Sequence, residues 1–491
     1  MDKQIRRVGI ILVALFIAVF AQLNYVQIFA AERIAKNPAN VLNLIREYAI
    51  KRGDILTRDG KVMAESRATH GKLKYLRVYP SGDLYGHITG YVSVGSGAHF
   101  GLENTYNDDL LGEGGVLSMQ QIQDRLFGGG HQGDDIQTTI DSRLQAAAKQ
   151  ALGNNRGAVV AMDPRSGDIR ALWSYPSYDP TGIASHDSTE AANAYKQLDA
   201  TSPTSPLVDI ATSNRYPPGS TFKVVTASAA IDSGKYTTKS TFPDPLALDL
   251  PLTNNTLMNF SHTTCAGGGQ IDLFTALTVS CDTTFALLGL KIPADIYDMA
   301  NRLEFNKTLP FDLSNVSSKY PNVPDKNAPL RAYSAIGQGN TAATPLQMAL
   351  VAATVANGGV VPEPHLLHEI IDPSGGLVKR FDPNSNLGRA MSPQTAADVT
   401  AMMQSVVDKG TGTNAQIPGV PVAGKTGTAQ TVAGTNPHTW FICFAPADNP
   451  KIAVAVIVEH GGTYGSEATG GLVAAPIAKQ ILEADRQIDG W

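Results

Sequence analysis

The sequence predicts an α+β fold in which an antiparallel sheet carries a cluster of helices, preceded by a smaller N-terminal domain and one transmembrane helix. The N-terminal stretch is largely apolar behind a basic start, and residues 34–137 are polar and rich in turns. From there a helix and a hairpin are followed by further helices, and strands return after residue 420. Strands that flank a run of helices in sequence can share one antiparallel sheet. We therefore divide the chain into residues 1–33, 34–137 and 138–491.

The first part is predicted to be a cytoplasmic tip and a single anchor in the plasma membrane. Three basic residues precede an apolar run at 8–21, and after two polar residues the apolar character resumes to Ala31. About 20 helical residues span a bilayer core of about 30 Å. Basic residues before the span favour a cytoplasmic N-terminus and an extracytoplasmic remainder. The alternative is a cleaved signal peptide, because residues 19–21 resemble a cleavage site; both alternatives export the chain.

Composition excludes one class of partner and gives no sign of a cofactor. The net charge is −5 and there is no run rich in Lys and Arg, so we expect no nucleic acid partner. The ten histidines show no H-E-x-x-H or comparable ligand spacing. We therefore expect neither a metal nor another cofactor.

The three cysteines divide into a candidate pair and a single thiol. Cys265 and Cys281 flank a Gly-rich loop. They either form a disulfide in an oxidising compartment or stay as two buried thiols, and the sequence does not decide between these. Cys443 lies in an apolar run and is predicted to be a buried thiol.

Local signals predict the individual elements. A hairpin is expected around Asp59-Gly60. Asp141 or Ser142 is expected to cap an Ala-rich helix, and two strands follow around a turn at Asp163-Pro164. The remaining predicted elements are helices at 222–232, 273–292, 344–359 and 472–488, and strands at 438–447 and 451–462.

Ser220 and Lys223 form an S-x-x-K motif at the start of the 222–232 helix. Their i to i+3 spacing puts both side chains on one helix face, so an amine can reach a hydroxyl. A serine becomes a nucleophile when a base removes its proton, and a lysine is such a base once its pKa is lowered enough to leave it neutral. The motif occurs once, in an apolar helix where an isolated lysine is costly without a role. We predict that Ser220 is the nucleophile and Lys223 its base.

Residues 425–428 form a second pattern, Lys425-Thr426-Gly427-Thr428. A cation beside a hydroxyl can hold a carboxylate, Gly427 allows a substrate backbone to approach, and the Thr428 N–H can face an oxyanion. The same stretch matches the phosphate-binding pattern G-x-x-x-x-G-K-[ST] from Gly419. That loop requires a helix directly after its Ser or Thr, whereas the residues here predict strand, turn and strand. Substrate binding is therefore favoured over nucleotide binding.

The order of these motifs resembles the penicillin-binding proteins, whose motifs are S-x-x-K, S-x-N and K-[ST]-G. The sequence has no S-x-N, but Ser280-Cys281-Asp282 stands where the second motif belongs. The resemblance makes Ser280 the proton shuttle to the leaving group. Asp282 substitutes a carboxylate acceptor for an amide donor. If ionised, Asp282 favours a protonated Lys223, so either Asp282 is paired elsewhere or the base differs in detail.

Three further segments resemble the class B branch of this family, which are single-pass, monofunctional transpeptidases. Residues 52–64 resemble the signature R-G-x-I-x-x-R-x-G-x-x-L-A, with Met63 in place of leucine, and residues 101–112 and 335–349 resemble two others. No glycosyltransferase domain is recognisable. The resemblance implies a penicillin-binding/serine β-lactamase-like transpeptidase domain at 138–491 and a non-catalytic domain at 34–137.

The resemblance also implies a reaction, acyl transfer on peptidoglycan stem peptides. Ser220 would attack the D-Ala-D-Ala peptide bond, backbone N–H groups of Ser220 and Thr428 would stabilise the oxyanion, and D-alanine would leave. An amine from a neighbouring stem would then resolve the acyl-enzyme. Lys425, Thr426 and Thr428 would hold the terminal carboxylate, and β-lactams would acylate the same serine.

Other functions remain as alternatives to transpeptidation. The expected partners are stem peptides, β-lactams, the membrane, and a glycosyltransferase or another divisome or elongasome component. A D,D-carboxypeptidase differs only in its acceptor, and a membrane-anchored β-lactam sensor is the non-enzymatic alternative. A class A β-lactamase is disfavoured because no glutamate between Asp282 and Lys425 has an asparagine three or four residues later.

Overall fold

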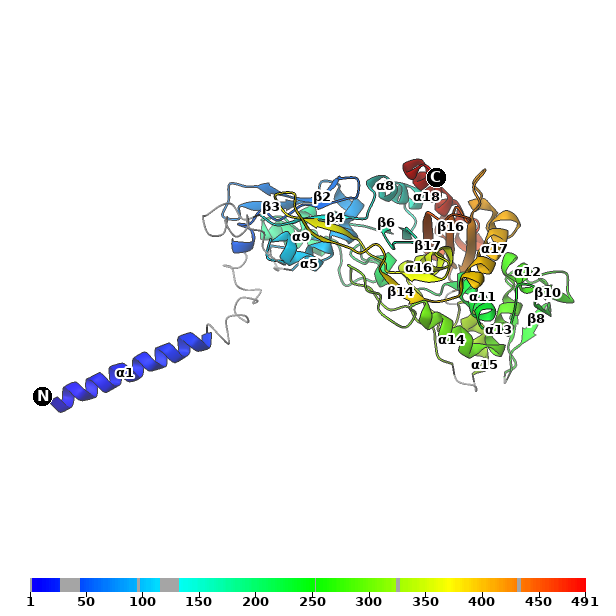
Figure 1. The fold of residues 1–491 in the computed structure, drawn as a ribbon, viewed down its shortest axis with the longest axis horizontal. Helices are drawn as coiled ribbons and strands as arrows, with labels where there is room; N and C mark the ends of the chain where they lie inside the picture. The colour runs from blue at the N-terminus through cyan, green and yellow to red at the C-terminus, as the bar shows by residue number, and fades with distance from the viewer. Residues whose placement is uncertain are drawn as a thin grey trace.

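The computed structural model describes residues 2–26, 45–94, 98–114, 132–251, 253–323, 327–430 and 434–491 (Figure 1). Helix α1 (Asp2–Asn24) projects away from the body of the protein. Its stretch Lys3–Asn24 is long and apolar enough to span a membrane, and none of it is buried. The chain thus has one N-terminal helix that could span a membrane. The end of the predicted anchor, residues 27–33, lies outside the described residues.

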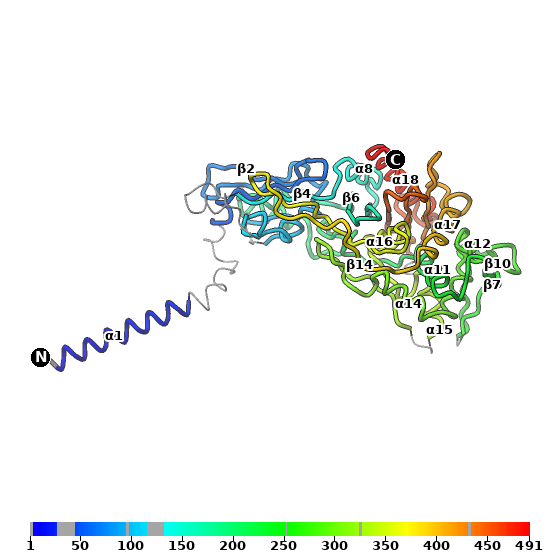
Figure 2. The backbone as a smooth tube through the Cα atoms, viewed as in Figure 1, coloured from blue at the N-terminus to red at the C-terminus, as the bar shows by residue number. Residues whose placement is uncertain are grey.

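Six strands form the N-terminal sheet, in the order β13-β12-β4-β1-β2-β3. The predicted hairpin around Asp59-Gly60 is confirmed, because β1 and β2 pair on either side of it and Gly60 takes a φ of 76°. β12 pairs antiparallel with β4, so a segment far along the chain completes this sheet. Figure 2 shows the yellow segment lying along the blue N-terminal strands. The strands are β1 (Ile55–Leu56), β2 (Val62–Ala68), β3 (Tyr75–Val78), β4 (Asp135–Thr138), β12 (Leu367–Ile371) and β13 (Leu377–Arg380).

A buried ion cluster joins the elements of this N-terminal part. The Glu103 carboxylate accepts from Arg52 Nε and from Arg77 Nε, each at 2.6 Å, and its side chain is fully buried. Arg77 also donates to the carbonyl of Gly53 at 2.7 Å. A buried carboxylate held by two guanidinium groups requires all three partners to remain in place. Glu103 belongs to α5 (Leu102–Thr105), and Arg52 also donates to Asn107 of α6 (Asn107–Leu110) at 2.8 Å. A third short helix, α4 (Gly86–Thr89), contacts α5.

The second sheet has five antiparallel strands, in the order β15-β16-β17-β5-β6. The predicted strands near both ends of the 138–491 region are therefore confirmed as members of one sheet. Asp141 caps α8, where its side chain accepts from the Arg143 N–H. The elements are β5 (Gly157–Met162), β6 (Ile169–Tyr175), β15 (Ala423–Ala429), β16 (His438–Ala445), β17 (Ile452–Val458), α8 (Ser142–Leu152) and α18 (Ala474–Asp489).

Side chains of this sheet alternate between two hydrophobic cores. Along β17, Ala453, Ala455 and Ile457 belong to the core shared with the central helices. Val454 and Val456 belong to the core beneath α8 and α18. Alternation of this kind follows from the two-residue period of a strand. Because every residue of β16 and β17 is buried, the sheet is covered on both faces, and its edge strand β15 lies next to the helical cluster.

The helical cluster contains the predicted helices, but one of them is divided in two. The 222–232 helix is present as α11, and the 344–359 helix as α16, capped by the Thr344 side chain. The predicted helix at 273–292 is wrong as a single element, since the structure has two. The helices of the cluster are α10 (Ile210–Ser213), α11 (Lys223–Asp232), α12 (Leu273–Thr278), α13 (Asp282–Lys291), α14 (Pro293–Arg302), α15 (Ala328–Ala335), α16 (Pro345–Ala356) and α17 (Pro393–Lys409). A further helix, α9 (Ser188–Gln197), lies beside the N-terminal strands (Figure 1).

A helix-ending turn at Ser280 separates α12 from α13. Cys281 N–H donates to the Ala276 carbonyl at 2.8 Å and Ser280 N–H donates to the Leu277 carbonyl at 3.2 Å. This is the Schellman pattern, with Ser280 at the left-handed position that glycine usually takes, at a φ of 65°. A non-glycine residue in that region is strained and is typical of functional sites. The turn therefore places Ser280 between two helices instead of within one.

Small hairpins and 3₁₀ turns complete the described fold. Two of the hairpins, β10 with β7 and β8 with β9, lie beside α12 and α13. The strands are β7 (Thr241–Pro243), β8 (Ala247–Asp249), β9 (Thr256–Met258), β10 (Gln270–Asp272), β11 (Val360–Pro362) and β14 (Asn386–Arg389), and the turns are η2 (Gly82–Tyr85), η3 (Pro180–Gly182), η4 (Gly219–Phe222), η5 (Thr413–Ala415) and η6 (Glu459–Glu467).

Candidate active site

Ser220 lies in η4, a tight turn that leads directly into α11. Gly219 has a φ of 53°, and its N–H donates to the Gly337 carbonyl at 2.9 Å. A Cβ on Gly337 would lie 2.1 Å from the Gly219 carbonyl oxygen, so only glycine fits there. The turn is therefore held rigidly against the 335–349 segment. Ser220 is half-buried, and its hydroxyl makes no hydrogen bond with any of the described residues.

Lys223 follows one turn later and is fully buried. Its Nζ donates to Asp282 Oδ1 at 2.7 Å, to the Ser280 carbonyl at 2.7 Å and to Ser280 Oγ at 3.3 Å. The sequence predicts that this amine reaches Ser220. In the structure its hydrogen bonds with the described residues are all to the second motif.

Asp282 begins α13, and its carboxylate is shared between two groups. Oδ1 faces Lys223, and Oδ2 accepts from the Phe260 N–H at 3.0 Å. Of the two alternatives that the sequence leaves open, pairing of Asp282 away from Lys223 is therefore excluded. The remaining alternative is that the base for Ser220 differs in detail from a neutral Lys223.

Lys425 approaches the same group of side chains from β15. It is fully buried, and its Nζ lies 2.8 Å from Ser280 Oγ and 3.0 Å from the Thr426 carbonyl. The structure thus brings Lys223, Ser280, Asp282 and Lys425 together, from three separate parts of the chain. Ser280 is at the centre, with a lysine nitrogen on either side.

Burial changes the proton affinity of both lysines. For Lys223 burial lowers the pKa, and the nearby Asp282 carboxylate opposes this effect. For Lys425 burial is again the main cause, and the charge of Lys223 lowers the pKa further, to well below 10.5. A site with two close lysines and one carboxylate favours one neutral amine.

The other residues of the third motif lie along the edge of the sheet. A Cβ on Gly427 would come within 2.8 Å of the Pro218 carbonyl, so this glycine is required by the approach of the Ser220 turn. The Thr428 carbonyl lies close to Gly219 in the same way. Since the N–H and C=O of one residue in an antiparallel strand point to the same side, the Thr428 N–H also faces the Ser220 turn.

The threonine hydroxyls have partners that the sequence does not indicate. Thr426 Oγ1 lies 2.6 Å from Thr411 Oγ1, and Thr428 Oγ1 accepts from the Gly470 N–H at 3.3 Å. Gly470 packs so closely on β15 that a Cβ would lie 2.5 Å from the Gly427 carbonyl. No motif marks Thr411 or Gly470, because their contacts with this strand depend on where the loops after α17 and before α18 lie in the fold.

Cys265 and Cys281 form a disulfide, with Cα atoms 5.7 Å apart. Cys281 separates Ser280 from Asp282, so the bridge fixes the second motif to the 265–269 loop. Asp244 stabilises that loop by accepting from the Cys265, Ala266 and Gly268 N–H groups. Cys443 is a buried free thiol, and burial raises its pKa.

The nucleotide-binding alternative is excluded by the position of Lys425. Residues 423–429 are a continuous strand, paired along its length with β16. The start of a helix, which a phosphate-binding loop needs directly after its Thr, is therefore missing at Thr426.

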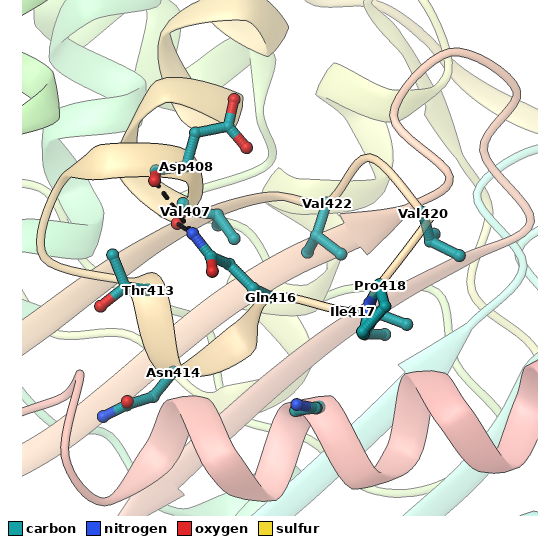
Figure 3. Close-up of a pocket in the computed structure, with 10 residues that line it drawn as sticks. Val407, Asp408, Thr413, Asn414, Gln416, Ile417, Pro418, Val420 and Val422 are labelled. Carbon is teal, nitrogen blue, oxygen red and sulfur yellow. Dashed lines mark hydrogen bonds between the residues drawn. The ribbon is translucent and has the colours of Figure 1, made fainter.

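A separate cavity of about 510 Å³ lies beside the start of β15, between α17, η5 and α18. Gln416 closes one wall by donating to the carbonyls of Val407 and Asp408, at 3.0 and 2.9 Å (Figure 3). Val422, which directly precedes β15, contributes to its lining, as does Lys479 of α18. None of the predicted site residues is among the residues that line it.

Comparison with known families decides the assignment. Residues 157–483 match the penicillin binding protein transpeptidase domain, and residues 52–136 match the penicillin binding protein A dimerisation domain. The chain belongs to the penicillin-binding proteins. It falls in class B, as the sequence resemblance implies.

Relatives of this penicillin-binding protein match it over nearly its full length. It is 38% identical to peptidoglycan D,D-transpeptidase PbpA of Mycolicibacterium smegmatis, and 36% identical to PbpA of Mycobacterium tuberculosis, each over 99% of both chains. The ceftriaxone acyl-enzyme complex of M. tuberculosis penicillin-binding protein A superposes with a TM-score of 0.84 at 36% identity, covering 90% of this chain and 99% of that one. The penicillin G acyl-enzyme complex gives 0.82 at 36% identity, covering 89% and 99%.

Proposed function

We propose that this penicillin-binding protein is a peptidoglycan D,D-transpeptidase that cross-links stem peptides through an acyl-enzyme on Ser220. The main support is structural: Lys223 and Lys425 both contact Ser280 beside the Ser220 turn. The relatives of this chain named as peptidoglycan D,D-transpeptidases support the same function. One serine hydroxyl can act as the nucleophile, and the buried lysines with the second serine can carry its proton.

Each motif has a proposed part in the reaction. Ser220 attacks the carbonyl carbon of the D-Ala-D-Ala bond, and the N–H groups of Ser220 and Thr428 hold the oxyanion. The Ser280 hydroxyl passes a proton to the leaving D-alanine. The terminal carboxylate lies with Lys425, Thr426 and Thr428, and the Thr411 hydroxyl orients that of Thr426. Gly427 contributes by allowing the strand and the Ser220 turn to touch.

β-Lactams are expected to acylate the same serine. The relatives that superpose on this chain include acyl-enzyme complexes with ceftriaxone, imipenem and penicillin G. A β-lactam carries an amide carbonyl and a carboxylate at a spacing similar to that of the stem terminus. It is therefore expected to use the same oxyanion and carboxylate groups, and to leave Ser220 blocked.

The proposed location is the outer face of the plasma membrane, with the chain anchored by α1. The basic residues in the first turns of α1 favour a cytoplasmic N-terminus, and the Cys265–Cys281 disulfide is typical of an oxidising compartment. We propose that residues 1–33 anchor the chain, that 34–137 are non-catalytic and that 138–491 form the transpeptidase domain. A glycosyltransferase or another divisome or elongasome component is the proposed protein partner, since no polymerising domain is recognisable.

The test is acyl transfer by the full-length protein in detergent micelles. A donor peptide ending in D-Ala-D-Ala and an excess of an amine acceptor are incubated with the wild type and with Ser220→Ala. We expect a cross-linked product and one released D-alanine for each bond formed, with neither product in Ser220→Ala. Released D-alanine without cross-linked product would identify a D,D-carboxypeptidase, and a stable acyl-enzyme without turnover would identify a β-lactam sensor.

A further inference from the structure

The short segment that leads to Ser220 has few backbone donors of its own. Two of the four residues before Ser220 are prolines, and proline has no N–H. The other two N–H groups bond to the 335–349 segment: Tyr216 donates to the Ala343 carbonyl at 3.0 Å, and Gly219 donates to the Gly337 carbonyl at 2.9 Å. Toward the five-stranded sheet, the same segment is held by side-chain bonds.

The first of these bonds joins the phenol group of Tyr216 to Glu459. The Tyr216 hydroxyl donates to Glu459 Oε1 and accepts from Asn214 Nδ2, the latter at 2.9 Å. Burial and the charge of Glu459 raise the pKa of Tyr216, so the hydroxyl stays protonated and remains a donor. A hydrogen bond to a carboxylate is roughly twice as strong as one between neutral groups. Glu459 therefore fixes the tyrosine side chain just before the nucleophile.

Glu459 is itself held at the end of two paired strands. Its Oε2 accepts from Arg156 Nε at 2.9 Å, and its N–H donates to the Arg156 carbonyl at 2.8 Å. The pairing of β5 with β17 ends at Gly157 and Val458, so Arg156 and Glu459 directly continue these strands. Only 9% of the Glu459 side chain is exposed. Its carboxylate thus connects Tyr216 to the five-stranded sheet.

Trp440 of β16 provides a second bond from the same sheet. Its indole N–H donates to the Pro217 carbonyl at 3.0 Å, and its side chain is fully buried. The Tyr216 ring packs edge-on against His438 and Trp440, with ring centroids 5.1 and 6.3 Å away. Both Tyr216 and Pro217 are therefore bonded to the sheet before the chain reaches Ser220.

We propose that Glu459 is a positioning residue for the nucleophile, and that it fixes the approach to Ser220 through the Tyr216 hydroxyl. This inference rests on the proposed function and adds to it a residue outside the three motifs. A reacting group that is misplaced by about 1 Å costs about 100-fold in rate. Because Glu459 acts on the nucleophile and not on the groups expected to hold the penicillin carboxylate, its loss lowers the rate of acylation and leaves non-covalent binding unchanged.

Tyr216→Phe removes the hydroxyl and keeps the ring with its contacts to β16. Rapid-quench intact mass of the full-length protein over a range of benzylpenicillin concentrations gives two constants separately, the limiting rate constant of acylation and the apparent dissociation constant. We expect the limiting rate constant to fall by about tenfold to 100-fold. The apparent dissociation constant should change by less than about twofold, because binding energy common to ground and transition state is not lost.

Tyr106→Phe is the matched control. The Tyr106 hydroxyl also donates to a carboxylate, that of Asp312, but Tyr106 lies between α5 and α6, outside the Ser220 turn. Both tyrosines are buried. Each variant therefore loses one phenol–carboxylate bond, and thermal unfolding should show a similar loss of stability. The limiting rate constant of Tyr106→Phe is expected to equal that of the wild type.

Glu459→Gln tests whether Tyr216 and Glu459 act as one unit. The amide has the size of the carboxylate but not its charge, so the bond to the tyrosine weakens and the limiting rate constant should fall. In the double variant Tyr216→Phe/Glu459→Gln there is no phenol hydroxyl left to fix. Its acylation should therefore be no slower than that of Tyr216→Phe alone, since residues that act through one contact are not additive.

The inference is overturned if Tyr216→Phe keeps the wild-type limiting rate constant, or loses no more of it than Tyr106→Phe does. It is also overturned if the effects of the two substitutions multiply in the double variant. Should Tyr216→Phe fail to fold, folded Glu459→Gln decides, and an unchanged limiting rate constant contradicts the inference. Failure of the wild type itself to be acylated would instead contradict the proposed function.

Discussion

Lys223 Nζ and Asp282 Oδ1 lie 2.7 Å apart and form an ion pair inside the candidate active site. The pair links the first motif to the second. The ion pair exists because Asp282 supplies a carboxylate at the position where the family's second motif has the amide of asparagine. The remaining lysine, Lys425, then has neutral partners alone among the described residues.

The charge state of Lys425 predicts a pH dependence of stability. Burial and the charge of Lys223 hold the pKa of Lys425 well below 10.5 in the folded state. Between the lowered pKa and 10.5 the unfolded chain binds more protons, so the free energy of unfolding rises with pH through that window. Lys425→Met is expected to remove this rise. Urea unfolding of the wild type and of Lys425→Met at pH 7 and pH 10 measures the change in the free energy of unfolding. An equal change in both proteins would contradict the prediction.

Removing the negative charge of Glu103 from the buried ion cluster is predicted to lower the stability of the fold strongly. Glu103→Gln leaves the guanidinium groups of Arg52 and Arg77 buried without their carboxylate, which costs about 3–5 kcal/mol. The matched control is Glu65→Gln, which breaks the more exposed pair with Arg67 and costs less than about 1 kcal/mol. Urea unfolding compares the two variants. Equal losses would show that the cluster does not hold the N-terminal sheet.

Gly337 is predicted to control the position of the nucleophile. In Gly337→Ala the new Cβ would collide with the Gly219 carbonyl, so the Ser220 turn must shift and acylation is expected to fall by about 100-fold or more. Gly234→Ala is the control, because Gly234 has a similar positive φ of 69° but nothing within 4 Å of its Cβ position. It should lose a little stability and keep its acylation rate. Similar acylation rates in both variants would contradict the prediction.

The disulfide is predicted to stabilise both the fold and the second motif. It closes a loop of 16 residues, for which the entropic contribution is about 3 kcal/mol. The Cys265→Ala/Cys281→Ala double variant should therefore unfold at lower urea concentration. It should also be acylated more slowly, because Cys281 holds Ser280 and Asp282 in place. An unchanged acylation rate in a destabilised protein would limit the bridge to a role in stability.

Most of the architecture follows from local patterns, and the exceptions have identifiable causes. The Asp59-Gly60 hairpin and the Asp141 cap depend on residues near one another, so the sequence predicts them. The pairing of β12 with β4 depends on residues more than two hundred positions apart, and no periodicity indicates it. The break at Ser280 was hidden because a serine occupies a position where glycine is the usual signal.

The candidate site shows the same division between local and distant information. Spacing identifies Ser220 and Lys223 on one helix face, but it does not reveal that Lys223 would pair with Asp282. Thr411 and Gly470 could not be found, because each reaches the third motif by a hydrogen bond from a loop distant in sequence, after α17 and before α18.

The most direct test of Ser220 as the nucleophile is the intact mass of the full-length protein after incubation with benzylpenicillin, beside Ser220→Ala. If Ser220 is the acylated nucleophile, the wild type carries a stable adduct of one penicilloyl group and Ser220→Ala carries none. An adduct that persists in folded Ser220→Ala, or no adduct on a wild type shown to be folded, would contradict the assignment of Ser220 as the acylated nucleophile.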